Sequence, residues 1–260
     1  MARTPRAAAG KAGTLVSRSA RIRTTALVVA TVALATVALA RAWPDGVGRG
    51  FWFWLAACAA GELLWVRLPL GGATLSMASC FNISALLVLP AGEAMLATAA
   101  ATLGMELIAM RKRPERALYN AAQTALAVGA GAAAFDALSG GGRDLVQLLS
   151  QLRLAPFLAA CAGFYAVNRA AVVLVVAWSG EIPLREAWRR NFGSSYEALS
   201  SGAVFSLGAL LATHYSGIGM AGTLLVALPL VLACDGMRRF TERLDAESRP
   251  EAGDDERRAA

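Results

Sequence analysis

Histidine is scarce in this chain of 260 residues, and the cysteines lack the spacing typical of metal ligands. His214 is the single histidine, placed in a short predicted loop, and no cysteine pair has CxxC spacing. Zinc sites usually combine several histidines or closely spaced cysteines, and a Ser-His-Asp triad would have to be built on His214 alone. We therefore expect no metal, no cofactor and no catalysis. A metal site made of carboxylates alone is the alternative that remains. The cysteines, each in a separate apolar stretch, are interpreted as buried small apolar side chains: Cys58, Cys80, Cys161 and Cys234.

Charged residues are also scarce. They make up 17% of the chain, while 57% of the residues are hydrophobic. A typical soluble chain is about a quarter charged, so this composition excludes an ordinary soluble globule. It predicts an all-α protein, a polytopic transmembrane helical bundle in a lipid bilayer. The net charge of +7 is spread over several loop ends without a basic, aromatic-containing domain, so we expect no nucleic-acid partner.

About eight hydrophobic stretches are long enough to cross the roughly 30 Å hydrocarbon layer of a bilayer. They cover residues 25–43, 51–67, 72–89, 92–110, 117–138, 155–178, 196–215 and 217–234. This division predicts three parts of the chain. Residues 1–24 form a basic, flexible cytoplasmic arm, 25–236 the transmembrane domain, and 237–260 a charged cytoplasmic tail that is disordered at its end.

Two of these spans admit a second interpretation. The third contains the polar run SMASCFNIS and ends at Pro90, which is also compatible with a broken or re-entrant segment. The first follows a basic arm and contains Ala38-Leu39-Ala40, which resembles a signal-peptide cleavage site. Cleavage after Ala40 would leave seven spans. The length of the arm, and Arg41 directly after the site, favour an uncleaved helix.

Lysine and arginine determine the predicted orientation, because short loops rich in these residues stay in the cytoplasm. With eight spans and both termini cytoplasmic, most of the 25 lysines and arginines fall on the cytoplasmic side. The outer side then holds Arg41, Arg49, Arg143 and Arg153. The pattern therefore predicts a multi-pass membrane protein with both termini in the cytoplasm.

Ionisable side chains inside the spans are the first candidates for function. Each costs roughly 2.5 to 3.5 kcal/mol on insertion scales, so such groups usually face the interior of the bundle. Arg169 lies near the middle of the sixth span and needs an acidic partner. Glu62 is the first choice because it lies at a similar depth, and Glu106 is the second. An intramembrane ion pair of Glu62 and Arg169 would serve helix packing, ligand binding or switching.

Uncharged polar side chains add to this set. Asn82 lies in the third span, Asn120 and Gln123 share one face of the fifth, and Asn168 lies in the sixth. Together with Glu106 they predict a ligand-binding cavity, and amide hydrogen bonds between helices are the alternative. We assign no special role to acids near helix ends: Asp136, Glu197 and Asp235. Glycines are interpreted as sites of close helix packing: Gly129, Gly131, Gly202, Gly208, Gly217, Gly219 and Gly222.

Several stretches carry a resemblance to a known family. The chain reads RKRPERALYNAAQTALA, then FYAVN, and near its end LLVALPLVLACDGMRRFTERLDAE. From about Trp65 to Leu244 it resembles the multi-span region that precedes HD-GYP or GGDEF output domains in many bacterial cyclic-dinucleotide signalling proteins. The resemblance implies a sensory role in a bacterial inner or plasma membrane. By it, four residues match the aromatic, asparagine and glutamine positions of the family: Tyr119, Asn120, Gln123 and Asn168.

The chain departs from this family in two places. Arg169 stands where an uncharged residue is expected, and the chain ends at Ala260, where the family continues into a catalytic domain. We therefore expect no output enzyme, and a cytoplasmic signalling partner or a second copy instead. A second, architectural likeness is to the substrate-capture subunits of energy-coupling-factor vitamin transporters. Those subunits bind a small molecule in a polar cavity and work with a separate membrane partner and ATPases.

These observations predict a non-enzymatic, stand-alone sensory or small-ligand-binding membrane module. A small molecule or lipid would occupy the polar cavity and tilt the last helix with its extension from Arg238 to Leu244. A transporter substrate-capture subunit is the alternative. An intramembrane enzyme would need Glu62, Glu106 and Asp136 to converge, and Asp136 lies near the opposite membrane face.

Overall fold

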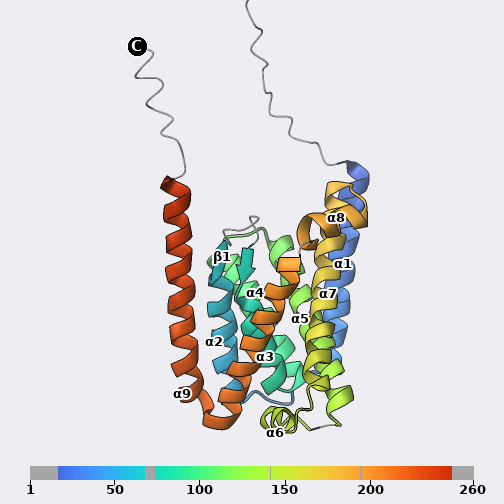
Figure 1. The fold of residues 1–260 in the computed structure, drawn as a ribbon. Helices are drawn as coiled ribbons and strands as arrows, with labels where there is room; N and C mark the ends of the chain where they lie inside the picture. The colour runs from blue at the N-terminus through green and yellow to red at the C-terminus, as the bar shows by residue number, and fades with distance from the viewer. Residues whose placement is uncertain (1–16, 68–73, 141, 194, 248–260) are drawn as a thin grey trace, which may run out of the picture.

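The computed structural model describes residues 17–67, 74–140, 142–193 and 195–247. Most of them are helical, and the long helices run side by side (Figure 1). The helices are α1 (Arg18–Arg41), α2 (Arg49–Leu63), α3 (Ala78–Val88), α4 (Ala91–Ile108), α5 (Pro114–Ser139), α6 (Leu145–Ser150), α7 (Ala155–Gly180), α8 (Leu184–Phe192) and α9 (Ser195–Glu247). A short antiparallel hairpin of β1 (Trp65–Arg67) and β2 (Thr74–Ser76) joins α2 to α3.

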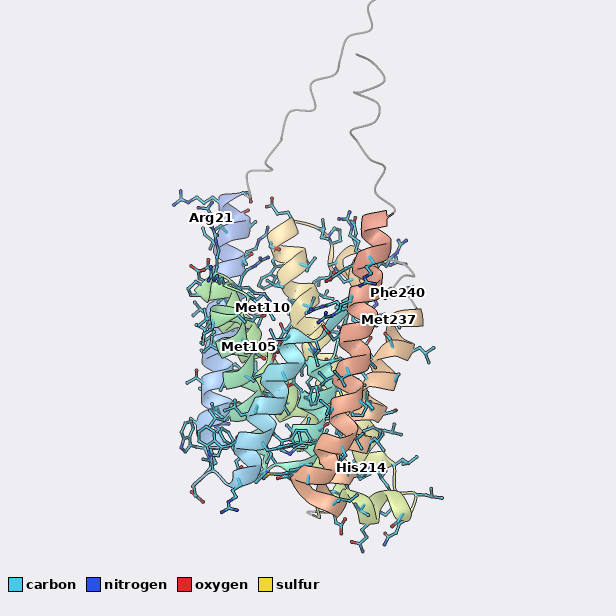
Figure 2. The ribbon with its side chains drawn as sticks, turned by 90° about the vertical axis from the view of Figure 1, so that its left-hand side faces the viewer. Arg21, Met105, Met110, His214, Met237 and Phe240 are labelled. Atoms are coloured by element: carbon cyan, nitrogen blue, oxygen red, sulfur yellow. The ribbon has the colours of Figure 1, made fainter. Side chains whose placement is uncertain are left out.

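Both ends of the described chain lie at the same end of the bundle. α1 begins and α9 ends there, beside β1 and α8, whereas α6 and the turn within α9 lie at the opposite end (Figure 1). We call these the terminal end and the turn end. Figure 2 shows Arg21 and Phe240 towards the terminal end and His214 towards the turn end. The two ends of the described chain therefore face the same side of any membrane that the helices cross.

Among the described residues, four helices are long and apolar enough to cross a membrane: α1, α5, α7 and the stretch Glu197–Arg243 of α9. The prediction of a helical membrane protein agrees with this finding. Several large apolar side chains of α1 and of the last part of α9 are exposed on the protein: Ile22, Val29, Leu34, Val37, Leu224, Leu225, Leu228 and Leu232. Such a large apolar surface suits contact with lipid tails.

The helix α9 contains the last two predicted spans. Gly219 has φ 79° and ψ −163°, a conformation that is essentially restricted to glycine, and the helix reverses direction there (Figure 1). The interpretation of Gly219 as a close-packing site was wrong, because no other group lies within 4 Å of the position of an added Cβ. His214 lies in α9 rather than in a loop, with Nδ1 2.9 Å from the carbonyl oxygen of Leu210.

The second and third predicted spans are shorter in the structure. α2 ends at Leu63 and the chain continues into the hairpin. The predicted start of the third span, residue 72, lies outside the described residues. α3 has 11 residues, which corresponds to about 16 Å, half of the hydrocarbon layer. A full helical span over 72–89 was therefore wrong, and the short helix before Pro90 fits the alternative of a broken segment.

The helix α3 forms the centre of the core. Nearly all its side chains are buried: Ala78, Cys80, Phe81, Asn82, Ile83, Ser84, Ala85, Leu86 and Leu87. α9 approaches it at Gly208, where an added Cβ would lie 2.7 Å from the carbonyl oxygen of Cys80. Ser84 Oγ donates a hydrogen bond to the carbonyl oxygen of Gly208 at 2.9 Å. The close-packing role predicted for Gly208 is therefore confirmed.

The outer helices extend further than predicted at both ends of the chain. α1 begins at Arg18, inside the predicted flexible arm, because Ser17 Oγ accepts a hydrogen bond from the backbone nitrogen of Ala20 at 3.1 Å and caps the helix. α9 continues to Glu247, inside the predicted tail. Asp235 pairs with Arg239 at 2.7 Å, one turn along, which supports the helix there. The rest of the arm and tail, residues 1–16 and 248–260, lies outside the described residues.

Candidate functional site

Polar side chains from five helices form a continuous belt in the half of the bundle next to the terminal end. They come from α2, α4, α5, α7 and α9, with one residue from the loop between α4 and α5. Each helix is hydrogen-bonded to the next through these groups. We call them the polar belt: Glu62, Thr102, Glu106, Lys112, Asn120, Gln123, Asn168, Arg169, Glu197 and Ser201.

Glu106 is the most deeply buried carboxylate of the polar belt. Its side chain is 5% exposed. Asn120 Nδ2 donates to both of its oxygens, at 2.8 and 2.9 Å. Lys112 Nζ lies 2.5 Å from Oε1, and the Lys112 side chain is 37% exposed. A buried carboxylate is thus neutralised by a cation that reaches it from the surface.

The tight loop between α4 and α5 creates this arrangement. Arg111 has a positive φ of 51°, and the backbone nitrogen of Lys112 donates to the carbonyl oxygen of Glu106 at 2.9 Å, so the chain reverses directly after α4. Pro114 then starts α5 at a position where a helix needs no N–H donor. The reversal places Lys112 over the end of α4 and brings Asn120 to the same carboxylate. Figure 2 shows Met105, in the last turn of α4, and Met110, within this loop.

Glu62 joins the polar belt through α4. Thr102 Oγ1 donates to Glu62 Oε1 at 2.7 Å. Thr102 lies one helical turn before Glu106 on α4, so the Glu62 carboxylate is bound one turn away from the Glu106–Lys112 pair. Two carboxylates and one ammonium group therefore share the region between α2, α4 and the α4–α5 loop.

The predicted ion pair of Glu62 and Arg169 does not form. Arg169 forms its ion pair with Glu197 and donates to Ser201 Oγ at 2.9 Å. Matching depth was an insufficient guide because α2 packs against α3 and α4, whereas the rings of Phe164 and Tyr165 on α7 pack against Phe205 of α9. The second choice, Glu106, was also wrong, because its cation is Lys112.

Glu197 is the functional candidate that the sequence reasoning missed. Its two oxygens accept from Arg169 and, at 2.9 Å, from the hydroxyl of Tyr165. The guanidinium of Arg169 also packs over the rings of Tyr165 and Phe192, at 5.0 and 4.4 Å from their centroids. An arginine side chain can extend along a helix towards the membrane surface. That reach is the signal that could have identified an acid near a helix end as the partner.

The five residues predicted to line one cavity form two pairs and a separate member. Asn120 binds Glu106, and Gln123 Nε2 donates to Asn168 Oδ1 at 2.6 Å. Asn82 is buried in α3, and no hydrogen bond among the described residues joins it to the other four. The amides of α5 therefore connect α4 on one side with α7 on the other.

Asp136 lies apart from the other acids, towards the turn end. Arg143 donates to both of its carboxylate oxygens, at 2.9 Å from Nε and 2.6 Å from Nη2. Within the described ranges, no three histidine, cysteine, aspartate or glutamate side chains are grouped to hold a metal ion. The acids that an intramembrane enzyme would need are thus separated along the bundle.

Comparison with known proteins finds no family model, no curated protein and no solved structure that matches this chain. The resemblance to bacterial signalling proteins therefore stays a prediction. The geometry of the polar belt is therefore the evidence from which a function can be proposed.

Proposed function

We propose that this protein is a non-enzymatic membrane sensor that recognises a small cationic molecule at Glu106. The observation that carries the proposal is the pairing of a buried carboxylate with a partly exposed lysine on a loop. A buried carboxylate needs a counter-charge. The ammonium or guanidinium group of a ligand can replace Lys112 Nζ, and the released lysine can then turn towards water. Asn120 would keep its hydrogen bonds to the carboxylate in both states.

The polar belt offers a route from this site to α9. Gln123 lies one turn after Asn120 and holds α7 through Asn168, and the next residue, Arg169, holds α9 through Glu197. A ligand shifts a conformational equilibrium when it prefers one of the states. We propose that release of Lys112 changes how α5, α7 and α9 pack. The last part of α9 would carry this response to a separate signalling protein at the terminal end.

The proposal includes a membrane topology. Eight passes connect the two ends of the bundle, and β2 together with α3 makes the third, since non-helical backbone is tolerated at membrane depth where protein surrounds it. The terminal end would face the cytoplasm of a bacterial cell. Lysine and arginine support this orientation, because in the described residues the turn end carries few cations: Arg41, Arg49, Arg143 and Arg153.

Thermal unfolding of the full chain in lipid nanodiscs tests the ligand class. The probes are agmatine, putrescine and choline, which present a guanidinium, primary amines and a quaternary ammonium. We expect at least one to raise the unfolding midpoint, because binding at a hundredfold excess over Kd adds about 2.7 kcal/mol to stability. The shift should be lost in Glu106→Gln and kept in Glu115→Gln, which alters an exposed glutamate of α5. A shift that survives Glu106→Gln, or the absence of any shift, contradicts the assignment.

The double variant Asn120→Ala with Gln123→Ala tests the route through the polar belt. In a folded protein, we expect it to weaken ligand binding or the output of the partner, and Gln147→Ala on α6 is the control because its side chain is exposed. No change in either readout would show that this site assignment is wrong.

Mass spectrometry of proteins crosslinked in cells separates the sensor from the transporter alternative. A co-purified kinase, cyclase or phosphodiesterase supports sensing. Transporter ATPases with their membrane scaffold would support a substrate-capture subunit instead.

A further inference from the structure

The helix α8 lies at the terminal end, where α7 leaves the bundle. Glu181 ends α7 in a left-handed conformation with φ 51°, and Pro183 caps α8. Ala187 is fully buried and packs in a cluster with Val173 and Ala177 of α7. One side of α8 is thus fixed against a membrane-spanning helix, which holds the rest of α8 at the level of the membrane surface.

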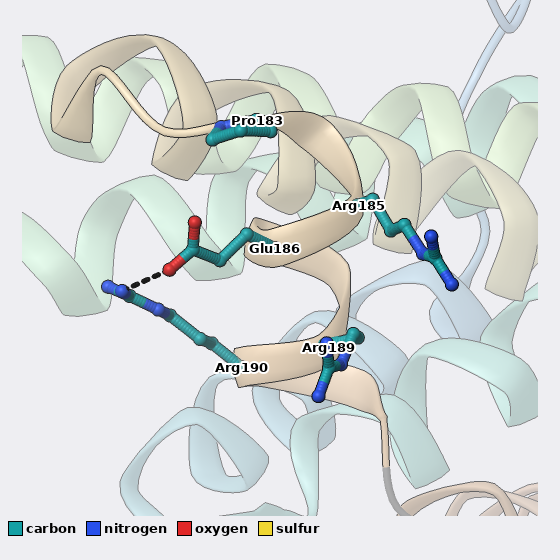
Figure 3. Close-up of a pocket in the computed structure, with 5 residues that line it drawn as sticks. All are labelled: Pro183, Arg185, Glu186, Arg189 and Arg190. Carbon is teal, nitrogen blue, oxygen red and sulfur yellow. Dashed lines mark hydrogen bonds and ion pairs between the residues drawn. The ribbon is translucent and has the colours of Figure 1, made fainter.

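An open pocket of about 550 Å³ lies along α8. It is lined by Pro183, Arg185, Glu186, Arg189 and Arg190 (Figure 3). Glu186 and Arg190 form an ion pair with each other on one side of the helix (Figure 3). Arg185 and Arg189 are one turn apart, and neither makes an ion pair with any residue that the structure describes. The pocket therefore presents two guanidinium groups whose charge is not neutralised within the described chain.

Exposed apolar side chains lie on the same short helix. Leu184 is 51% exposed and Trp188 is 41% exposed, and the Trp188 ring packs edge-on against Phe192 with centroids 5.6 Å apart. Tryptophan is enriched where a membrane meets water, and helices with basic and apolar faces lie in the headgroup layer. The arginine pair thus sits beside groups suited to the glycerol and upper acyl region of a lipid.

We propose that Arg185 and Arg189 bind the phosphate of an anionic phospholipid in the leaflet at the terminal end. A guanidinium group binds phosphate oxygens through paired hydrogen bonds. Two guanidinium groups together carry two positive charges, which favours a lipid of net negative charge over a zwitterionic lipid. The neighbouring Trp188 and Leu184 identify a lipid, rather than a soluble anion, as the occupant. This site is independent of any ligand at Glu106.

Native mass spectrometry of the full chain released from mixed nanodiscs tests the proposal. The discs contain phosphatidylglycerol and phosphatidylcholine in equal amounts, and the measured quantity is the ratio of the two lipids retained. We expect the wild type to retain phosphatidylglycerol preferentially. The double variant Arg185→Gln with Arg189→Gln should lower the preference roughly tenfold or more at low salt, because the charge-assisted hydrogen bonds from the two guanidinium groups to one phosphate are lost. An unchanged preference overturns the proposal.

The double variant Arg113→Gln with Arg116→Gln is the matched control. Both arginines are exposed at the same end and their replacement removes the same charge. An equal loss of preference in this control would mean that general surface charge attracts the lipid, which overturns a site on α8. Unfolding midpoints in phosphatidylcholine alone should be unchanged in both variants, because none of the four side chains is buried.

Inorganic phosphate distinguishes a lipid from a soluble anion. We expect phosphate added to phosphatidylcholine discs to leave the unfolding midpoint of the wild type unchanged, and phosphatidylglycerol to raise it. A rise with phosphate that equals the rise with phosphatidylglycerol would assign the pocket to a soluble phosphate compound and overturn the lipid.

Discussion

The ion pair Arg143–Asp136 towards the turn end and the ion pair Lys112–Glu106 towards the terminal end differ in how the cation is held. Towards the turn end, Arg143 donates to both oxygens of Asp136 and to the carbonyl oxygens of Leu86 and Leu89. Towards the terminal end, Lys112 Nζ donates to Glu106 and to no other residue in the described ranges. One cation is fixed by backbone and side chain together, the other by a single side chain.

Pro90 explains why Arg143, the partner of Asp136, also binds backbone carbonyl oxygens. Proline has no N–H, so the carbonyl oxygen of Leu86 loses the partner that a continuing helix would provide. Arg143 Nη1 donates to this oxygen at 3.3 Å, and a cation at a helix C-terminus is also favoured by the helix dipole. The comparison teaches that the number of fixed acceptors distinguishes a structural ion pair from one whose cation can be replaced.

Arg143→Met should have the largest effect on this comparison. It leaves two helix-end carbonyl groups and Asp136 without their donor, and each unsatisfied buried acceptor costs about 1 to 3 kcal/mol. We expect the free energy of unfolding in detergent–lipid micelles to fall by about 3 kcal/mol, allowing for partial exposure of the pair. Arg153→Met, an exposed arginine at the same end, should change it little. Equal losses in the two variants would remove the structural role of Arg143.

Lys112→Met should have the next largest effect, because it leaves the buried carboxylate of Glu106 without a cation. Breaking one side of a buried pair costs several kcal/mol; the two hydrogen bonds from Asn120 reduce the expected loss to about 2 kcal/mol. Adding Glu106→Gln to this variant should restore most of the stability, which denaturant unfolding can measure. A double variant no more stable than Lys112→Met alone would contradict the pairing.

Glu106→Gln by itself should destabilise the protein by about 1 kcal/mol or less. The amide oxygen still accepts from Asn120, and the lysine left behind is already 37% exposed and can be hydrated. The loss of stability should therefore be smaller than in Lys112→Met, when both variants are measured in the same unfolding series. The reverse order would show that Lys112 is the more confined partner.

Gln123→Ala should have the smallest effect. It removes the hydrogen bonds from Gln123 to Asn168, and hydrogen bonds between membrane helices contribute about 0.6 kcal/mol on average. The expected loss of unfolding free energy is of that size. Gln147→Ala supplies the reference for an exposed glutamine. A loss of several kcal/mol would mean that this link of the polar belt is a structural element comparable to Arg143.

The helical class and most helix positions could be predicted from long apolar runs, because a chain that crosses lipid must satisfy its backbone hydrogen bonds internally. The polar run before Pro90 left a broken segment as an alternative to a full third span, and the short α3 agrees with that alternative. The hairpin could not be predicted, because its strands have three residues each and no alternating pattern marks them. Gly219 was one of many glycines, and the positive φ that makes it a turn is a property of the folded backbone.

Within the candidate site, several members of the predicted polar set do lie together, whereas the partners in the ion pairs could not be predicted. Glu106 and Asn120 were placed in one set, and the tight loop between their helices brings them together. The partner of Arg169 depended on which helices are neighbours, and depth along a span carries no such information. Glu62 therefore seemed well matched to Arg169, although Glu197 holds that guanidinium.

The backbone conformation of Gly219 determines at which end of the bundle the described part of α9 finishes. Without a reversal, the 53 residues of α9 would form one rod of about 80 Å, far longer than the bilayer is thick. A leucine at this position would favour continuation of the rod and would carry Arg238 away from the side where Arg18 lies. One residue without a side chain thus returns the C-terminal part of α9 to the end of the bundle at which α1 begins.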